Sequence, residues 1–240
     1  MSLALMWIFA LASLAGTIVA LQFMPDTIPM HFDFAGNVDR WGSKWEALVF
    51  PAVILLLAFI WTLCIKHSLK NAAVKAVAEA SCDEEGQKKA VFSKVNAKTF
   101  GIVAAAVTAL LALVNGALLR GSYSVAVGNG TNALHLAFKI VFALLGAILV
   151  VLGNFMPKTR INGIFGVRVK WSVYNDSAWK KANRFGGLAA IVTGLLIVAA
   201  AVVFNSVHVL FATELGLVAI STIVVLLYAR TVYLREVGAR

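Results

Sequence analysis

The sequence predicts an all-α, polytopic membrane protein with six transmembrane helices. Hydrophobic residues make up 61% of its 240 residues and the mean hydropathy is +0.88, whereas a soluble domain has about 45–50% apolar residues. The excess lies in runs of roughly 20 residues, the length that crosses a hydrocarbon core of about 30 Å. A transmembrane barrel would instead show short segments of alternating polarity. The predicted spans are 2–23, 46–65, 99–119, 133–155, 185–204 and 207–229.

The first run is predicted to be a retained span rather than a cleaved signal peptide. It lacks a basic start, and no clear small-residue cleavage site precedes the polar residues that follow it. Pro51 falls near the first turn of the second run, where proline is tolerated because that backbone nitrogen needs no helical partner. The last two runs are joined by a very tight link at Asn205 and Ser206.

The loop at residues 24–45 is predicted to be structured and not helical. Two prolines interrupt any helix, and Ala35-Gly36-Asn37 is typical of a turn. Its imidazole and carboxylate groups suggest a metal site, with His31, Asp33 and Asp39 as weak candidate ligands. We favour the alternative of a compact loop held by its own hydrogen bonds, with Trp41 and Trp45 in the interfacial aromatic belt. We therefore predict no bound metal.

Residues 66–98 separate two regions of the chain. An N-terminal two-helix module covers residues 1–65, and a four-helix region covers residues 99–240. The segment between them is rich in Ala, Lys and Glu. We expect two helical extensions that reverse direction near residues 83–86.

The segment 153–187 differs most from the rest of the chain. It carries seven Lys and Arg residues, two Trp and one acidic residue. Pro157 is predicted to end the fourth span, residues 164–173 to be extended, and Asn175, Asp176 or Ser177 to cap a short helix that leads into the fifth span. Trp171 and Trp179 are predicted at the lipid headgroups, with Lys and Arg contacting anionic membrane lipids.

The distribution of positive charge predicts the orientation. Loops 66–98 and 156–184 and the C-terminal tail together carry seventeen Lys and Arg residues, whereas the opposite side of the predicted membrane carries three. The positive-inside rule then places both termini and both basic loops in the cytoplasm, and loop 24–45 outside. The formal net charge of +10 therefore indicates a membrane surface rather than direct binding of nucleic acid.

Two charged residues are predicted inside the membrane. Lys139 and Glu214 lie at matched depth in the fourth and sixth spans, and His135 is one helical turn from Lys139. Charges at this depth need a partner or water. We favour an interhelical ion pair between Lys139 and Glu214 over a proton-sensing or substrate-sensing site.

Several classes of function have no support in the sequence. Cys64 and Cys82 show no pairing pattern, so we predict free thiols. There is no Cys/His cluster and no HExxH, GxSxG or P-loop pattern, so we predict neither an enzyme nor a cofactor. Two alternatives stay open: a small transporter or exporter, suggested by Lys139, Glu214 and Asn115, and a metal-dependent membrane enzyme that uses loop 24–45.

The segment after the fourth span resembles the SdpI-type bacterial immunity proteins. Their signature has the form GNxMPKxxxNxxxGIRxPWT, followed by a Trp and R-x-GG. The residues of this chain at the signature positions are Gly153, Asn154, Met156, Pro157, Lys158, Asn162, Gly166, Val167, Arg168, Trp171, Ser172, Trp179, Arg184, Gly186 and Gly187. Lys170 and Ser172 stand where the signature has Pro and Thr.

Loop 24–45 resembles the module usually joined to that family, of the form LPxxIPxHFNxxGxxDxxGSK. The residues of this chain at those positions are Met24, Pro25, Ile28, Pro29, His31, Phe32, Gly36, Asp39, Gly42, Ser43 and Lys44. Asp33 replaces the usual Asn and adds a charge.

The resemblance implies a multi-pass protein of the bacterial cytoplasmic membrane that protects the producing cell from a secreted toxic peptide. Loop 24–45 would meet the peptide outside, and loop 153–187 would carry the response inside. In the best-known system, the response includes holding a repressor protein at the membrane.

Overall fold

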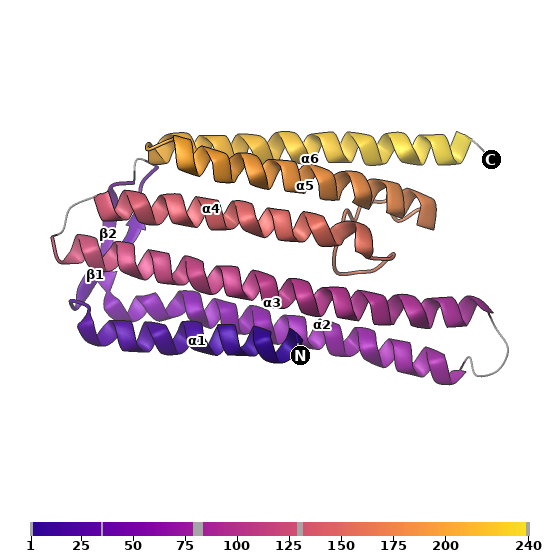
Figure 1. The fold of residues 1–240 in the computed structure, drawn as a ribbon, viewed down its shortest axis with the longest axis horizontal. Coiled ribbons are helices and arrows are strands. Elements are labelled where there is room, and N and C mark those ends of the chain that lie inside the picture. The colour runs from indigo at the N-terminus through magenta and orange to yellow at the C-terminus, as the bar shows by residue number, and fades with distance from the viewer. Residues whose placement is uncertain (1, 35, 79–83, 129–131, 239–240) are drawn as a thin grey trace.

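The chain folds into a bundle of six long helices. The computed structural model describes residues 2–34, 36–78, 84–128 and 132–238, with only the backbone of residues 71–78, 84–94 and 133. Each of the six helices in these ranges is long and apolar enough to cross a membrane, which confirms the predicted fold class. The helices are α1 (Ser2–Phe23), α2 (Val49–Ala78), α3 (Glu84–Ala126), α4 (Asn132–Phe155), α5 (Asp176–Val203) and α6 (Val207–Gly238) (Figure 1).

The helices lie side by side, and α1 and α6 form opposite edges of the bundle (Figure 1). Helices α1 and α2 both pack on α3, which packs on α4, and the row continues through α5 to α6. The connections α1–α2, α3–α4 and α5–α6 lie at one end, called here the hairpin end. The loop between α4 and α5 is called here the basic loop. It and the two chain termini point toward the other end, called here the basic-loop end (Figure 1).

Two helices are longer than a bilayer needs. Helix α2 has 30 residues and α3 has 43, which is about 45 and 65 Å at 1.5 Å per residue. Both therefore continue past a 30 Å core as the predicted helical extensions of segment 66–98. The predicted reversal covers residues 83–86. Residues 84–86 belong to the first turn of α3, and residue 83, like Cys82, lies outside the described residues. Cys64 is a free thiol.

A β-hairpin joins α1 to α2, although no sequence pattern predicted strands there. Strands β1 (Thr27–Phe32) and β2 (Val38–Ser43) pair antiparallel, with Thr27 opposite Ser43 and Phe32 opposite Val38. The predicted turn is present, and Gly36 adopts a φ of +81° in it, a conformation that suits glycine. A short 3₁₀ helix, η1 (Lys44–Leu48), then leads into α2.

Helices α4 and α5 approach each other closely through paired glycines. A Cβ on Gly146 would overlap the carbonyl oxygen of Gly194, and one on Gly153 would overlap that of Gly187. Small residues allow backbones in membranes to come this close, and dispersion contacts then hold the helices together. The two glycines of the R-x-GG motif therefore lie at a packed helix contact, where Gly186 and Gly187 are both buried.

Candidate functional site

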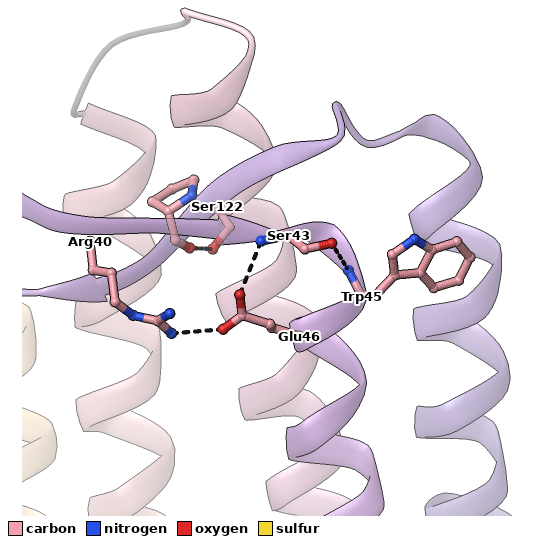
Figure 2. Close-up of polar contacts among 6 residues, drawn as sticks. Arg40, Ser43, Trp45, Glu46 and Ser122 are labelled. Carbon is pink, nitrogen blue, oxygen red and sulfur yellow. Dashed lines mark hydrogen bonds and ion pairs between the residues drawn. The ribbon is translucent and has the colours of Figure 1, made fainter.

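The base of the hairpin is fixed by polar contacts to its surroundings (Figure 2). The Arg40 guanidinium donates to Glu46 Oε2 over 2.8 Å, and the Ser43 backbone N–H donates to Glu46 Oε1 over 3.0 Å. Ser43 Oγ in turn accepts from the Trp45 backbone N–H. Ser43 and Glu46 together form a capping box for η1. Ser122 of α3 donates its hydroxyl to the carbonyl of Pro29 over 3.2 Å.

Most residues of the hairpin motif have an architectural role. A Cβ on Gly42 would overlap the Glu46 carboxylate. Lys44 Nζ donates to the Met24 carbonyl at 3.3 Å and lies 3.0 Å from Asp26 Oδ1, which ties the two ends of the loop together. Pro29 is fully buried, and Pro25 is half-buried where the chain leaves α1.

The candidate metal ligands His31, Asp33 and Asp39 divide into two separate contacts. His31 Nδ1 and Asp39 Oδ1 are 2.6 Å apart and solvent-exposed. Asp33 instead accepts from the backbone N–H and the side-chain amide of Asn37, and so holds the turn. Within the described part of the chain, no three His, Cys, Asp or Glu side chains come close enough to hold a metal ion.

The hairpin reaches across the bundle to the far helices. Phe32 packs edge-on against Phe138 of α4 at 5.3 Å between ring centroids, and Phe34 against Phe211 of α6 at 5.7 Å. A Cβ on Gly36 would meet Val207 at the start of α6. The hairpin therefore connects the N-terminal module to α4 and α6, which no sequence pattern indicated.

The basic loop follows η2 (Met156–Lys158) and is organised by Asn162. Asn162 Oδ1 accepts from the backbone N–H groups of Ile164 and Phe165, at 2.8 and 2.7 Å. Its Nδ2 donates to the carbonyls of Arg160 and Phe165. A single amide thus satisfies four backbone groups, which explains why the loop needs this side chain.

A second asparagine attaches the loop to α5. Asn183 is fully buried, its Oδ1 accepts from the Val167 N–H at 2.8 Å, and its Nδ2 donates to the Trp179 carbonyl. Gly166, with a φ of +120°, lies against it so closely that a Cβ would overlap Asn183 Oδ1. Only glycine accommodates this combination of backbone conformation and contact.

Trp179 is part of the loop's core, so its predicted place among the lipid headgroups is wrong. It is 1% exposed, and its indole Nε1 donates to the Thr159 carbonyl over 3.0 Å. A buried indole N–H needs such a partner. The backbone N–H of Arg160 donates to Asn96 Oδ1 of α3 over 2.9 Å, so the loop also contacts the long third helix. Trp171 is half-buried.

The extended conformation predicted for residues 164–173 is also wrong. This stretch contains bends and a turn at residues 170–172 rather than a strand. Ser172 stabilises the turn, since its Oγ lies 2.6 Å from the Val167 carbonyl and accepts from the Val169 N–H. Side-chain hydrogen bonds of this kind compete with the β preference of branched residues.

The predicted short helix before the fifth span is the first part of one continuous helix, α5. Asn175 is its N-cap, because Oδ1 accepts from the Ala178 N–H at 2.7 Å. Glu236, near the end of α6, accepts from Ser177 and pairs with Lys181, both at 2.7 Å. No sequence pattern indicated Glu236, because its partners lie more than 50 residues away along the chain.

Several polar residues of the family signature do not take part in the hydrogen bonds of this framework. Asn154, Arg168 and Arg184 are exposed, and their side chains make no hydrogen bond or ion pair with the described residues. Lys158 is exposed too and lies 4.2 Å over the ring of Phe155. A cavity of about 580 Å³ at the basic-loop end brings Asn154, Pro157, Lys181 and Arg184 together with apolar residues of α5 and Tyr228 of α6.

The predicted ion pair between Lys139 and Glu214 does not form. Lys139 Nζ instead donates to the Val202 carbonyl at 3.2 Å and to Asn205 Oδ1 at 2.9 Å. A cation is favoured there because the C-terminus of α5 carries unpaired carbonyls. Matched depth was therefore not enough to predict a contact. Glu214 is half-buried and has no ion pair among the described residues, and His135 is half-buried.

Comparisons with known proteins match two separate regions of the chain. Residues 158–229 match the SdpI/YfhL protein family, and residues 8–55 match a domain of unknown function, DUF1648. An uncharacterized protein of Archaeoglobus fulgidus is 36% identical over 52 residues, which cover 22% of this chain and 25% of that relative. The chain therefore aligns with a quarter of the relative's length. No solved structure matches the chain. Through residues 158–229, this multi-pass membrane protein is similar to the SdpI/YfhL protein family, and its residues 8–55 are similar to DUF1648.

Proposed function

We propose that this membrane protein is a non-enzymatic immunity protein that protects its cell against a secreted, membrane-acting peptide. The observation that carries the proposal is the division of the family signature into two sets. Asn162, Gly166 and Trp179 build the loop, whereas Arg168 and Arg184 are exposed and make no contact that the described fold requires. Polar groups that the fold does not use are available for binding.

Arg168 is the best candidate within the exposed set. It follows Val167, whose backbone N–H is bonded to buried Asn183, so its position is fixed by the core although its side chain is free to act. Arginine offers a planar set of donors that suits a carboxylate or phosphate. With the basic-loop end in the cytoplasm, as the charge distribution predicts, this face would carry the response inside the cell.

The exposed hairpin surface is our candidate for contact with the peptide outside. His31 and Asp39 form an exposed pair there, on a hairpin that also contacts α4 and α6. A peptide that shifted the hairpin would therefore act on helices that lead toward the basic-loop end.

The test is survival of a host that produces this chain when challenged with a panel of purified membrane-acting peptides. We expect the native chain to raise survival against at least one peptide, and Arg168→Glu to abolish that protection at an unchanged membrane level of protein. Lys170→Glu is the matched control, because Lys170 is also exposed and two residues away, and because it replaces the Pro of the signature rather than matching it. Full protection by Arg168→Glu would refute a working role for the loop.

Signalling through a repressor is a separable part of the proposal. The exposed cations at the basic-loop end would suit a protein with an acidic surface. Membrane fractionation of candidate repressors, with and without the native chain, measures it directly. Protection without any recruitment would leave immunity in place and remove the signalling role.

A further inference from the structure

An apolar groove of about 290 Å³ begins at the basic loop and continues along α4, α5 and α6. On α5 it is lined by Gly186, Ala190 and Thr193, which share one helix face because they are four and three positions apart. From Gly186 to Thr193 the groove extends about 10 Å at 1.5 Å per residue. The other helices contribute Leu149, Met156, Val218, Ser221, Thr222, Val225 and Leu226. Val218 and Thr222 are exposed, so the groove opens to the surroundings of the bundle.

A cation stands at the basic-loop end of this groove. Val167, Arg168 and Val169 line that end, and among the described lining residues Arg168 alone is charged. The position of Arg168 is set by its neighbour, because Val167 packs so closely on Gly186 that a Cβ added to Gly186 would overlap it. The Arg168 side chain is exposed and makes no hydrogen bond or ion pair with the described part of the chain. Its donors are therefore available to a ligand.

The groove also holds a hydroxyl that the fold does not use. Thr193 is 6% exposed, and its side chain makes no hydrogen bond with any residue that the structure describes. Thr222 differs, because its hydroxyl donates to the Val218 carbonyl. A buried polar group without a partner is costly in an apolar medium. An occupant that brings a hydrogen-bond acceptor part of the way along the groove is therefore favoured.

We propose that the groove binds one anionic phospholipid, with its phosphate on Arg168 and an acyl chain along α5. The arginine provides the planar set of donors that a phosphate accepts. An acyl chain matches the apolar lining, and the ester carbonyls between phosphate and chain are acceptors for Thr193. The lining residues of α4, α5 and α6 belong to helices long and apolar enough to cross a membrane, where phospholipids are the molecules that meet this surface.

The charge around the groove favours an anionic headgroup over a zwitterionic one. Residues 153–187 carry seven Lys and Arg residues and one acidic residue, and such a basic segment attracts lipids with a net negative charge. Inorganic phosphate fits less well, because it would leave the apolar lining and Thr193 without a partner. An acidic protein segment that met Arg168 at the basic-loop end would leave the same part of the groove unfilled.

This inference names a ligand for Arg168 and rests on the proposed function only for the consequence in the cell. Lipid binding is measured on the purified chain, and protection is measured by survival. Binding without protection would refute the immunity function and keep the lipid site. Protection that needs Arg168, without lipid binding, would do the reverse.

The first test is native mass spectrometry of the delipidated chain in detergent, titrated with phosphatidylglycerol. We expect one tightly bound lipid per chain and weaker binding of phosphatidylethanolamine. Arg168→Gln should bind phosphatidylglycerol about tenfold more weakly, because a charged hydrogen-bond partner of the phosphate is lost. Lys170→Gln is the matched control and should leave the affinity unchanged, since Lys170 is exposed two residues away and does not line the groove.

The second test locates the acyl chain, with phosphatidylglycerol that carries a photoreactive diazirine in its chain. The label should attach to groove residues of α5 and α6 in the native chain, and Ala190→Leu should remove it by filling the groove. Leucine is nearly as good a helix former as alanine, so this variant should fold. Ala199→Leu is the matched control and should keep the label, because Ala199 is exposed on the same helix and lies outside the groove.

The third test concerns the ester carbonyl. Thr193→Val removes the hydroxyl at similar side-chain volume. It should weaken the binding of phosphatidylglycerol and leave the binding of its dialkyl ether analogue, which has no ester carbonyl, unchanged. Equal effects on the two lipids would contradict the contact between Thr193 and the ester.

Four results would overturn the proposal. These are a delipidated chain that binds no phosphatidylglycerol, an Arg168→Gln variant that binds it as tightly as the native chain, an acyl label that Ala190→Leu leaves in place, and equal affinity for phosphatidylglycerol and for its headgroup alone, glycerophosphoglycerol. The first three remove the lipid or its position, and the fourth assigns Arg168 to a soluble anion.

Discussion

Replacing Gly166 by alanine tests whether the basic loop is held by the backbone geometry described above. At a φ of +120°, a residue with a Cβ costs about 1–3 kcal/mol. The added Cβ would also overlap Asn183 Oδ1 and so break its hydrogen bond with the Val167 N–H. The buried Asn183 amide then lacks a hydrogen-bond partner, which costs about 1–3 kcal/mol more. We therefore expect Gly166→Ala to lower the free energy of unfolding by about 2–6 kcal/mol.

Gly163→Ala provides the matched control three residues away. Gly163 has no atom within 4 Å of an added Cβ and no positive φ, so the change should be within about 0.5 kcal/mol. The assay is equilibrium unfolding in mixed detergent micelles, followed by tryptophan fluorescence. Equal effects at the two glycines would refute the loop geometry, since only Gly166 lies against Asn183.

Two further predictions concern buried and charged groups. Trp179→Ala should lower the unfolding free energy by about 3–5 kcal/mol, because it leaves a cavity where the buried indole was. Trp171→Ala should lower it by no more than about 1 kcal/mol. A larger loss for Trp171→Ala than for Trp179→Ala in the same unfolding assay would contradict the buried position of Trp179. Lys139→Met should destabilise by about 1–2 kcal/mol through lost bonds to Val202 and Asn205, whereas Glu214→Gln should change folding by less than about 0.5 kcal/mol. A large coupling energy between Lys139→Met and Glu214→Gln in a double-mutant cycle would instead support the predicted ion pair. Normal folding of Glu214→Gln with lost activity would support a functional role, including transport.

Local chemistry predicted much of the candidate site. Pro157 was expected to end the fourth span, and α4 ends at Phe155 before the η2 turn that contains this proline. Asn175 was among the expected caps and does cap α5. These features depend on a few neighbouring residues, so the sequence is sufficient to predict them.

Contacts between distant segments were predicted poorly. The hairpin was missed because its strands gain much of their stability by packing on α3, α4 and α6, which alternation of residue types does not show. Lys139 and Glu214 have equal depth, yet depth says nothing about which faces of two helices meet. Trp179 was assigned to the headgroups for the same reason, since an aromatic residue next to basic ones fits both a membrane interface and a small buried core.

The sequence by itself determined that this chain crosses a membrane through six helices, because the length and apolarity of each run follow directly from the thickness of the bilayer. It also determined the family resemblance, which rests on residue types in fixed order. Only the tertiary structure decided which signature residues build the loop and which stay free, because that depends on contacts such as Gly166 with Asn183. It also separated glycines that pack helices within the chain, such as Gly146, from glycines that face open space, such as Gly16 and Gly116.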